Sequence, residues 1–164
     1  MSLNKIDYRK LIYILISGII YFATAFTLEM LVQSTLDWIF RTMGISGILA
    51  FEDAQNAYYI IRLGIVYLSS GYLGGLYAGY KIKENLKLNM TFPSLIGFLL
   101  IFTMQYFLGY SAVLKALSLI GFAKIIAMPL IVSLVGSYLG GYTVNWQVEE
   151  KPKEEKISLI FKES

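Results

Sequence analysis

The side chains of this sequence that could do chemistry are mainly carboxylates, and four of them fall between residues 29 and 53: Glu29, Asp37, Glu52 and Asp53. Two carboxylates can carry out acid/base catalysis, or they can bind a divalent cation through oxygen. The chain has no cysteine and no histidine, so thiol nucleophiles, CxxC redox pairs, His-ligated haem and His- or Cys-bound zinc are excluded. Nothing in the sequence fixes the distance between the four acids. We therefore expect surface charge rather than an enzyme, and we predict no catalytic, metal-binding or cofactor-binding residue.

The elements that carry these acids have the composition of a membrane protein. Of the 164 residues, 57% are hydrophobic and only 15% are charged, more apolar surface than a soluble domain of this size can bury. Each of four charge-free runs reaches the ~18 residues that suggest a membrane-spanning helix: Leu11–Leu28, Leu63–Tyr80, Leu88–Leu114 and Ile125–Val148. The predicted fold is an all-α integral membrane protein, a four-transmembrane-helix bundle with helices at about 8–43, 54–83, 92–113 and 122–146. Residues 147–164 form a charged cytoplasmic tail, which Pro152 should keep from extending the helix.

Positive charge predicts the orientation of the chain. Ten of the 14 Lys and Arg residues lie before the first run, between the second and third, and after the fourth. The positive-inside rule then places both termini in the cytoplasm, as in a multi-pass protein of the cell membrane. The basic start, the apolar residues Leu11–Phe22 and the Ala23-Thr24-Ala25 triplet together resemble a cleavable signal peptide. The apolar run continues past the triplet, however, which favours a retained first helix.

Small residues recur every four positions in the second and fourth runs. Gly71, Gly75 and Gly79 form one such face, and the other contains Gly136, Gly140 and Gly141. Faces without side chains let helices approach closely in lipid, so we predict that these six glycines pack helices two and four together within one chain. The alternative is that one face meets a second copy of the chain.

The same two runs indicate an internal duplication. A shift of 66 positions aligns the segment from Ile65 to Gly75 with that from Ile131 to Gly141, with seven identities in 11 positions. Gly18 and Thr24 match Gly97 and Thr103 at a shift of 79. Two hairpins that both enter from and return to the cytoplasm would be parallel repeats related by an axis along the membrane normal.

One ion pair is predicted inside the membrane. Glu29 and Arg62 each lie 19 residues from a basic residue at the inner boundary, Lys10 and Lys81. At ~1.5 Å per residue both reach the outer edge of the hydrocarbon, about 28 Å away. An unpaired Arg62 in lipid would be costly, so a facing Glu29 is expected, unless Arg62 extends outward to the headgroups instead.

These features predict a non-enzymatic accessory, assembly or scaffolding subunit that acts through glycine-zipper packing. Its partners would be the lipid bilayer and other membrane proteins or a second copy of itself, with no nucleic acid. The alternative is a small channel or transporter, including one built as a homo-oligomer. Parallel repeats and Pro129 could serve transport, but the polar residues between the interfaces are mainly hydroxyls, which commonly bond their own helix backbone.

Overall fold

The computed structural model describes residues 8–42, 52–82, 89–107 and 119–160, with the backbone alone at 52–55 and 145–160. These residues form four helical runs and no strand. The first is α1 (Tyr8–Thr42), and the second joins α2 (Glu52–Ile61), the π-helix η2 (Arg62–Leu68) and α3 (Ser69–Lys81). The third is α5 (Thr91–Gln105), and the fourth joins α7 (Leu119–Phe122), the π-helix η4 (Ala123–Ala127) and α8 (Met128–Ile160). The expectation of an all-helical chain is confirmed for this part of it.

Two helices in the described part are long and apolar enough to cross a membrane: Tyr8–Thr42 and Leu119–Val144. α5 is apolar but has only 15 residues. At ~1.5 Å per residue it measures about 22 Å, less than the ~30 Å of a bilayer's hydrocarbon core. The predicted extension of this helix to residue 113 falls largely on residues outside the described ranges.

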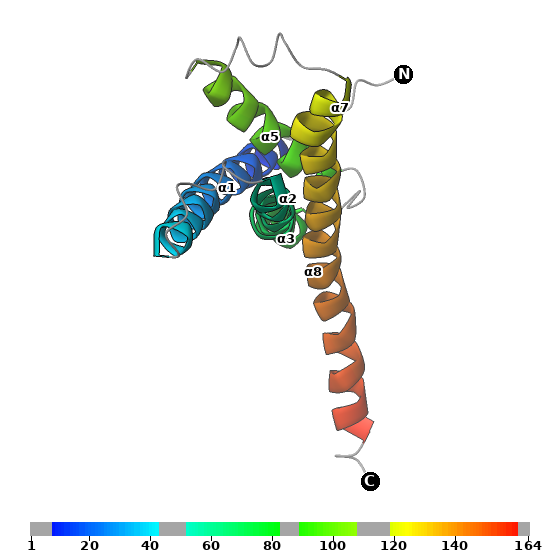
Figure 1. Ribbon diagram of the computed structural model, residues 1–164. Coiled ribbons are helices and arrows are strands. Elements are labelled where there is room, and N and C mark those ends of the chain that lie inside the picture. The colour runs from blue at the N-terminus through cyan, green and yellow to red at the C-terminus, as the bar shows by residue number, and fades with distance from the viewer. Residues whose placement is uncertain (1–7, 43–51, 83–88, 108–118, 161–164) are drawn as a thin grey trace.

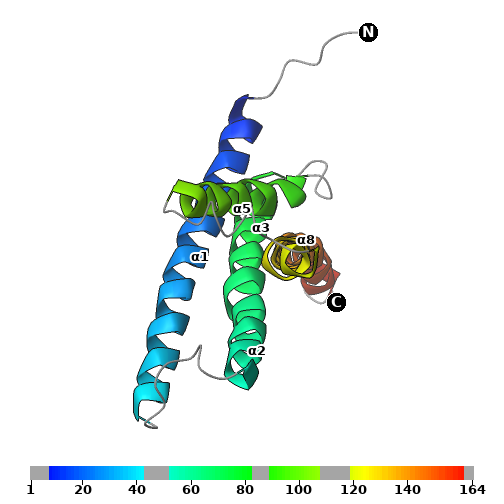
Figure 2. The same cartoon turned by 45° about the horizontal axis from the view of Figure 1, so that its top comes forward.

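Contacts along the chain define the helix directions. Residues near Ser17 on α1 meet Gly74 on α3, whereas Glu29 meets Arg62, so these two helices are antiparallel. Gly18 on α1 lies against Ile96 on α5. Further along both helices, Glu29 of α1 and Gln105 of α5 line one cavity. Figure 1 shows α8 beside this group, and Figure 2 shows α1 and α3 side by side with α5 running across both. The helices therefore cross one another, unlike the aligned helices of a regular four-helix bundle.

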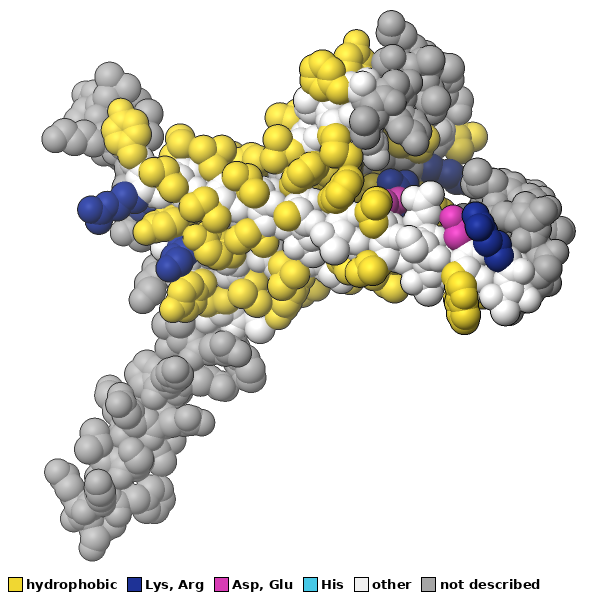
Figure 3. All heavy atoms as spheres, turned by 90° about the vertical axis from the view of Figure 1, so that its left-hand side faces the viewer, with side chains coloured by type: hydrophobic (Ala, Val, Ile, Leu, Met, Phe, Trp, Pro, Cys, Tyr) yellow, Lys and Arg dark blue, Asp and Glu magenta, His cyan; other side chains and the backbone are white. Residues whose placement is uncertain are grey.

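Little of the apolar side-chain surface is buried. The main buried cluster consists of Tyr21, Ala25, Val32, Val66 and Tyr67, each at most 8% exposed. Large hydrophobic side chains are exposed along all four helical runs, among them Ile19 on α1 and Leu139 on α8. In Figure 3 hydrophobic side chains cover most of the face, and the charged side chains gather toward its two ends. An apolar middle with charged ends is the surface pattern expected of helices surrounded by lipid.

The fourth run differs from its predicted boundaries of 122–146 at both ends. A glycine can end a helix, but this run is helical from Leu119 and continues past Gly121, because glycine is well tolerated inside apolar helices. At the other end α8 continues through Pro152 to Ile160, which corrects the expected end near Trp146. The residues around Pro152 are mostly Glu and Lys, which are good helix formers, although the proline itself removes one backbone hydrogen bond. α8 thus projects well beyond the other helices (Figure 1).

Two π-helical segments were not predicted. η2 interrupts the second run at Arg62, and η4 directly precedes α8 and its second residue, Pro129. Proline has no N–H to donate to the carbonyl four residues earlier, and a wider turn is a common way to absorb that loss. η2 contains no proline; π-turns inside α-helices often mark functional positions. Because η2 begins at Arg62, we consider Arg62 a candidate functional residue.

Candidate functional site

α3 and α8 meet backbone to backbone. A Cβ atom added to Gly71 would overlap the carbonyl oxygen of Ser133, and one added to Gly75 would overlap that of Ser137. At Gly79 the added atom would lie 2.9 Å from the Cα atom of Gly141. Because both partners advance by four residues from one contact to the next, the two helices run in the same direction. No side chain larger than hydrogen fits at Gly71 or Gly75 without separating the helices.

The glycines of α8 complete this contact from the other side. Added Cβ atoms would overlap the carbonyl oxygen of Leu68 at Gly136 and that of Tyr72 at Gly140. At Gly141 the added atom would instead overlap the side chain of Met90, which is 4% exposed. All six of these glycines therefore lie against a neighbouring helix. Gly141 also contacts Met90, the residue that precedes α5. No pattern in the sequence indicated that Met90 packs against Gly141.

A second close contact joins α1 and α5. A Cβ atom on Gly18 would lie 2.8 Å from Cβ of Ile96, and one on Gly97 would overlap the ring of Tyr21. Sequence analysis did not assign these glycines to helix packing. The signal was present, however, because Gly18 and Gly97 are the pair that aligns at a shift of 79 positions.

Hydroxyl groups fill the space where the four helices cross. Ser17, Ser70, Ser94, Ser133 and Ser137 are fully buried. The Ser94 hydroxyl donates to the carbonyl of Ser133 at 2.8 Å, and the Ser133 hydroxyl lies 2.6 Å from that of Tyr21. Ser137 donates to the carbonyl of Met90, which ties α8 to the start of α5.

Every buried polar side-chain atom in the described part of the chain has a hydrogen-bond partner. Ser17 and Ser70 donate to carbonyls of their own helices, those of Ile14 and Val66. Satisfied hydroxyls stabilise helix contacts where no water is present, because an unpaired polar group would be costly to bury. The arrangement of this crossing region serves packing, and it offers no free polar group to a solute.

Glu29 and Arg62 form an ion pair between α1 and η2. Arg62 Nε lies 2.8 Å from Glu29 Oε2, and the Tyr58 hydroxyl donates to Glu29 Oε1 at 2.8 Å. The two side chains of the pair are only 24% and 27% exposed. The Arg62 guanidinium also lies 5.3 Å from the centre of the Tyr67 ring, within the range of a cation–π contact. Both carboxylate oxygens of Glu29 are thus occupied, which leaves this residue poorly placed to act as a general base.

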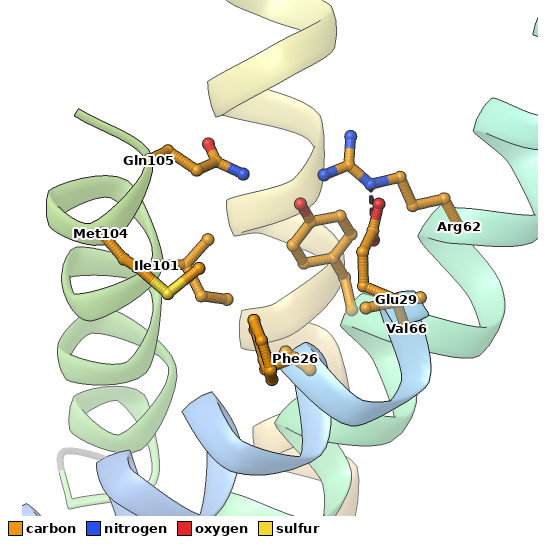
Figure 4. Close-up of a pocket in the computed structure, with 9 residues that line it drawn as sticks. Phe26, Glu29, Arg62, Val66, Ile101, Met104 and Gln105 are labelled. Atoms are coloured by element: carbon orange, nitrogen blue, oxygen red, sulfur yellow. Dashed lines mark hydrogen bonds and ion pairs between the residues drawn. The ribbon is translucent and has the colours of Figure 1, made fainter. Parts of the chain in front are cut away.

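A small cavity of about 50 Å³ lies beside this ion pair. Its polar wall contains Glu29, Arg62 and Gln105, and its apolar wall includes Phe26 and Met104. Figure 4 shows the Gln105 amide on α5 and the outer nitrogens of Arg62 pointing toward the same space from opposite sides. The sequence alone does not single out Gln105, because its approach to Arg62 depends on how α5 crosses α1.

Among the acids whose side chains the structure describes, Asp37 does not join Glu29 in a site. Asp37 lies eight residues further along α1, about 12 Å away at ~1.5 Å per residue. The side chains of Glu52 and Asp53 lie outside the described residues. The backbone of Asp53 belongs to α2, which begins at Glu52.

We compared the chain with known protein families, curated proteins and solved structures. No protein-family model, curated protein or solved structure gives a significant match to the chain. Function is therefore argued from the residues and contacts described above.

Proposed function

We propose that this chain is a multi-pass protein of the cell membrane that acts as an accessory, assembly or scaffolding subunit without enzymatic activity. In this proposal its four helical runs cross the bilayer with both termini in the cytoplasm, as two parallel-repeat hairpins joined by a glycine zipper. The observation that carries it is the helix crossing, where glycine contacts and buried hydroxyls are all used for packing. What remains available is the exposed apolar surface.

That outer surface is the part of the molecule that could bind a partner. Exposed hydrophobic side chains line the outer face of α8, with Ile131, Val135 and Leu139 each about half exposed. The three lie at spacings of four residues and therefore on one face of the helix. Truncating them should not disturb the internal packing, because they face away from the other helices.

Purification in a mild detergent with identification of co-purifying proteins tests the proposal. We expect a stoichiometric complex with another membrane protein, or a defined oligomer. A variant with Ile131, Val135 and Leu139 replaced by alanine maps the α8 face, and the matched control replaces Leu11, Leu15 and Ile19 on the exposed side of α1. Loss of the complex in one variant alone would identify the binding helix.

Transport is the competing function, and the same preparation tests it. Flux of ions or small solutes into liposomes that contain only this protein would favour a channel or transporter and contradict the accessory role. A monodisperse, folded monomer that neither binds a partner nor conducts would contradict both functions.

A further inference from the structure

We propose that the cavity between α1, η2 and α5 binds the phosphate group of a phospholipid, with Arg62 and Gln105 as its hydrogen-bond donors. The proposal rests on the membrane insertion proposed above. It does not depend on the accessory role, since a lipid site would serve a transporter equally well.

The chemistry begins with the donors of Arg62. A guanidinium carries five N–H groups, and Glu29 takes the one on Nε. Tyr67 also lines this cavity. In Figure 4 one outer nitrogen of Arg62 points toward Gln105, and both outer nitrogens, Nη1 and Nη2, lie on the guanidinium edge away from Glu29. Their parallel N–H groups match two oxygens of a phosphate, a geometry that lysine cannot reproduce. The Gln105 amide reaches the same space from α5 and can add a further donor.

The electrostatics favour a singly charged phosphate. Glu29 already neutralises Arg62, so the pair presents oriented donors rather than net positive charge. A doubly charged inorganic phosphate would be repelled by the nearby carboxylate, whereas the phosphodiester of a lipid carries one negative charge. Tyr58 and Arg62 hold both oxygens of Glu29, which keeps the carboxylate on the Nε side of the guanidinium.

The size of the cavity fits a group of a few atoms such as a phosphate, and the surface beside it is apolar enough to contact an acyl chain. About 50 Å³ exceeds the ~10–15 Å³ that one water needs, so a group of several atoms can enter. Phe26 lines the cavity, and both it and Met30 one turn later on α1 are about half exposed. These two side chains offer an apolar track leading away from the polar end.

The depth of the site points to lipid rather than to a soluble anion. Arg62 is 19 residues from Lys81 at the opposite end of the same helical run. This corresponds to about 28 Å, close to the ~30 Å thickness of the hydrocarbon core. The cavity would therefore lie beside the glycerol and phosphate layer of the outer leaflet.

The test measures lipid binding by native mass spectrometry and by thermal unfolding in detergent. The probes are phosphatidylglycerol, diacylglycerol with the same chains, and inorganic phosphate. We expect phosphatidylglycerol to bind in a one-to-one complex and raise the melting temperature, with no effect from the other two. Gln105→Leu should weaken binding about tenfold, as expected for a lost hydrogen bond to a charged group, and leaves the ion pair intact. Gln33→Leu on the exposed side of α1 is the matched control and should bind like the wild type.

Equal binding of diacylglycerol, or unchanged binding by Gln105→Leu, would overturn the phosphate site. Competition by millimolar inorganic phosphate would overturn the lipid as its occupant. Carbonate extraction of membranes keeps the two proposals apart. A protein that is released by carbonate is not inserted, and the proposed function then fails together with this one; a retained protein without lipid binding refutes only the site.

Discussion

The ion pair of Glu29 and Arg62 joins α1 to η2, and its surroundings decide what it contributes. Exposed ion pairs contribute little, but this one is about three-quarters buried and shares a hydrogen bond with Tyr58. In a membrane either charge alone would have to find another partner or move toward the headgroups. The main effect of the pair is therefore that each residue lowers the free-energy cost of burying the charge of the other.

A double-mutant cycle tests this coupling. Arg62→Met alone leaves Glu29 without its cation, so it should cost more unfolding free energy than the double variant Arg62→Met with Glu29→Gln. We expect the coupling to be about 1–2 kcal/mol, measured by reversible unfolding in detergent. Strict additivity of the two single changes would mean that the pair contributes nothing to folding.

Among the elements, α3 has the central position, because it contacts α8 through its glycine face and α1 through Gly74. Both contacts depend on the absence of side chains. A glycine inside a helix costs up to about 1 kcal/mol relative to alanine, so the repeated glycines are explained by close approach rather than by helix formation. The geometry also supplies a natural control, since an added Cβ at Gly64 on η2 meets nothing within 4 Å.

The pair Gly75→Ala and Gly64→Ala separates packing from helix propensity. Gly75→Ala should lower stability by several kcal/mol or prevent folding, because its Cβ would overlap a backbone carbonyl. Gly64→Ala should be neutral or stabilising by up to about 1 kcal/mol. Thermal unfolding of both variants in one detergent makes the comparison. If Gly75→Ala kept a stable monomer and only dispersed an oligomer, the glycine face would be external.

At the scale of the whole molecule, the two ends of the α1–α3 pair offer a test of the predicted orientation in the membrane. α1 ends at Thr42 and α3 ends at Lys81, at opposite ends of an antiparallel pair, and both residues are exposed. The distribution of lysine and arginine predicts that the Lys81 end lies in the cytoplasm. Because the chain has no cysteine, replacing any one residue by cysteine introduces a single thiol at a known position.

Cysteine labelling with a membrane-impermeant maleimide tests the orientation. In intact cells Thr42→Cys should react and Lys81→Cys should not, and both should react after the membrane is permeabilised. The reverse pattern would invert the topology. Equal labelling in intact cells would argue against insertion of this hairpin.

Local patterns in the sequence were sufficient to predict the helices, because apolar runs and four-residue spacings involve neighbours within a turn or two. They also placed Glu29 and Arg62 at the same depth, since a helix converts residue counts into distance. The same patterns were unreliable at ends and interruptions: Gly121 and Pro152 suggested breaks where helix continues, and the turn at η2 has no local signal. There, competing local preferences differ by only about 1 to 3 kcal/mol, so neighbouring structure decides.

The sequence by itself determined that this chain is helical and strongly apolar, and which residues leave room for close contact. Only the tertiary structure decided what fills that room. The hydroxyls of Tyr21 and Ser133 lie 112 positions apart in the chain, and Gln105 reaches the cavity beside Arg62 only because α5 crosses α1. These long-range contacts depend on the angles at which whole helices cross. Many small contacts together set those angles, and no periodic pattern within a single helix encodes them.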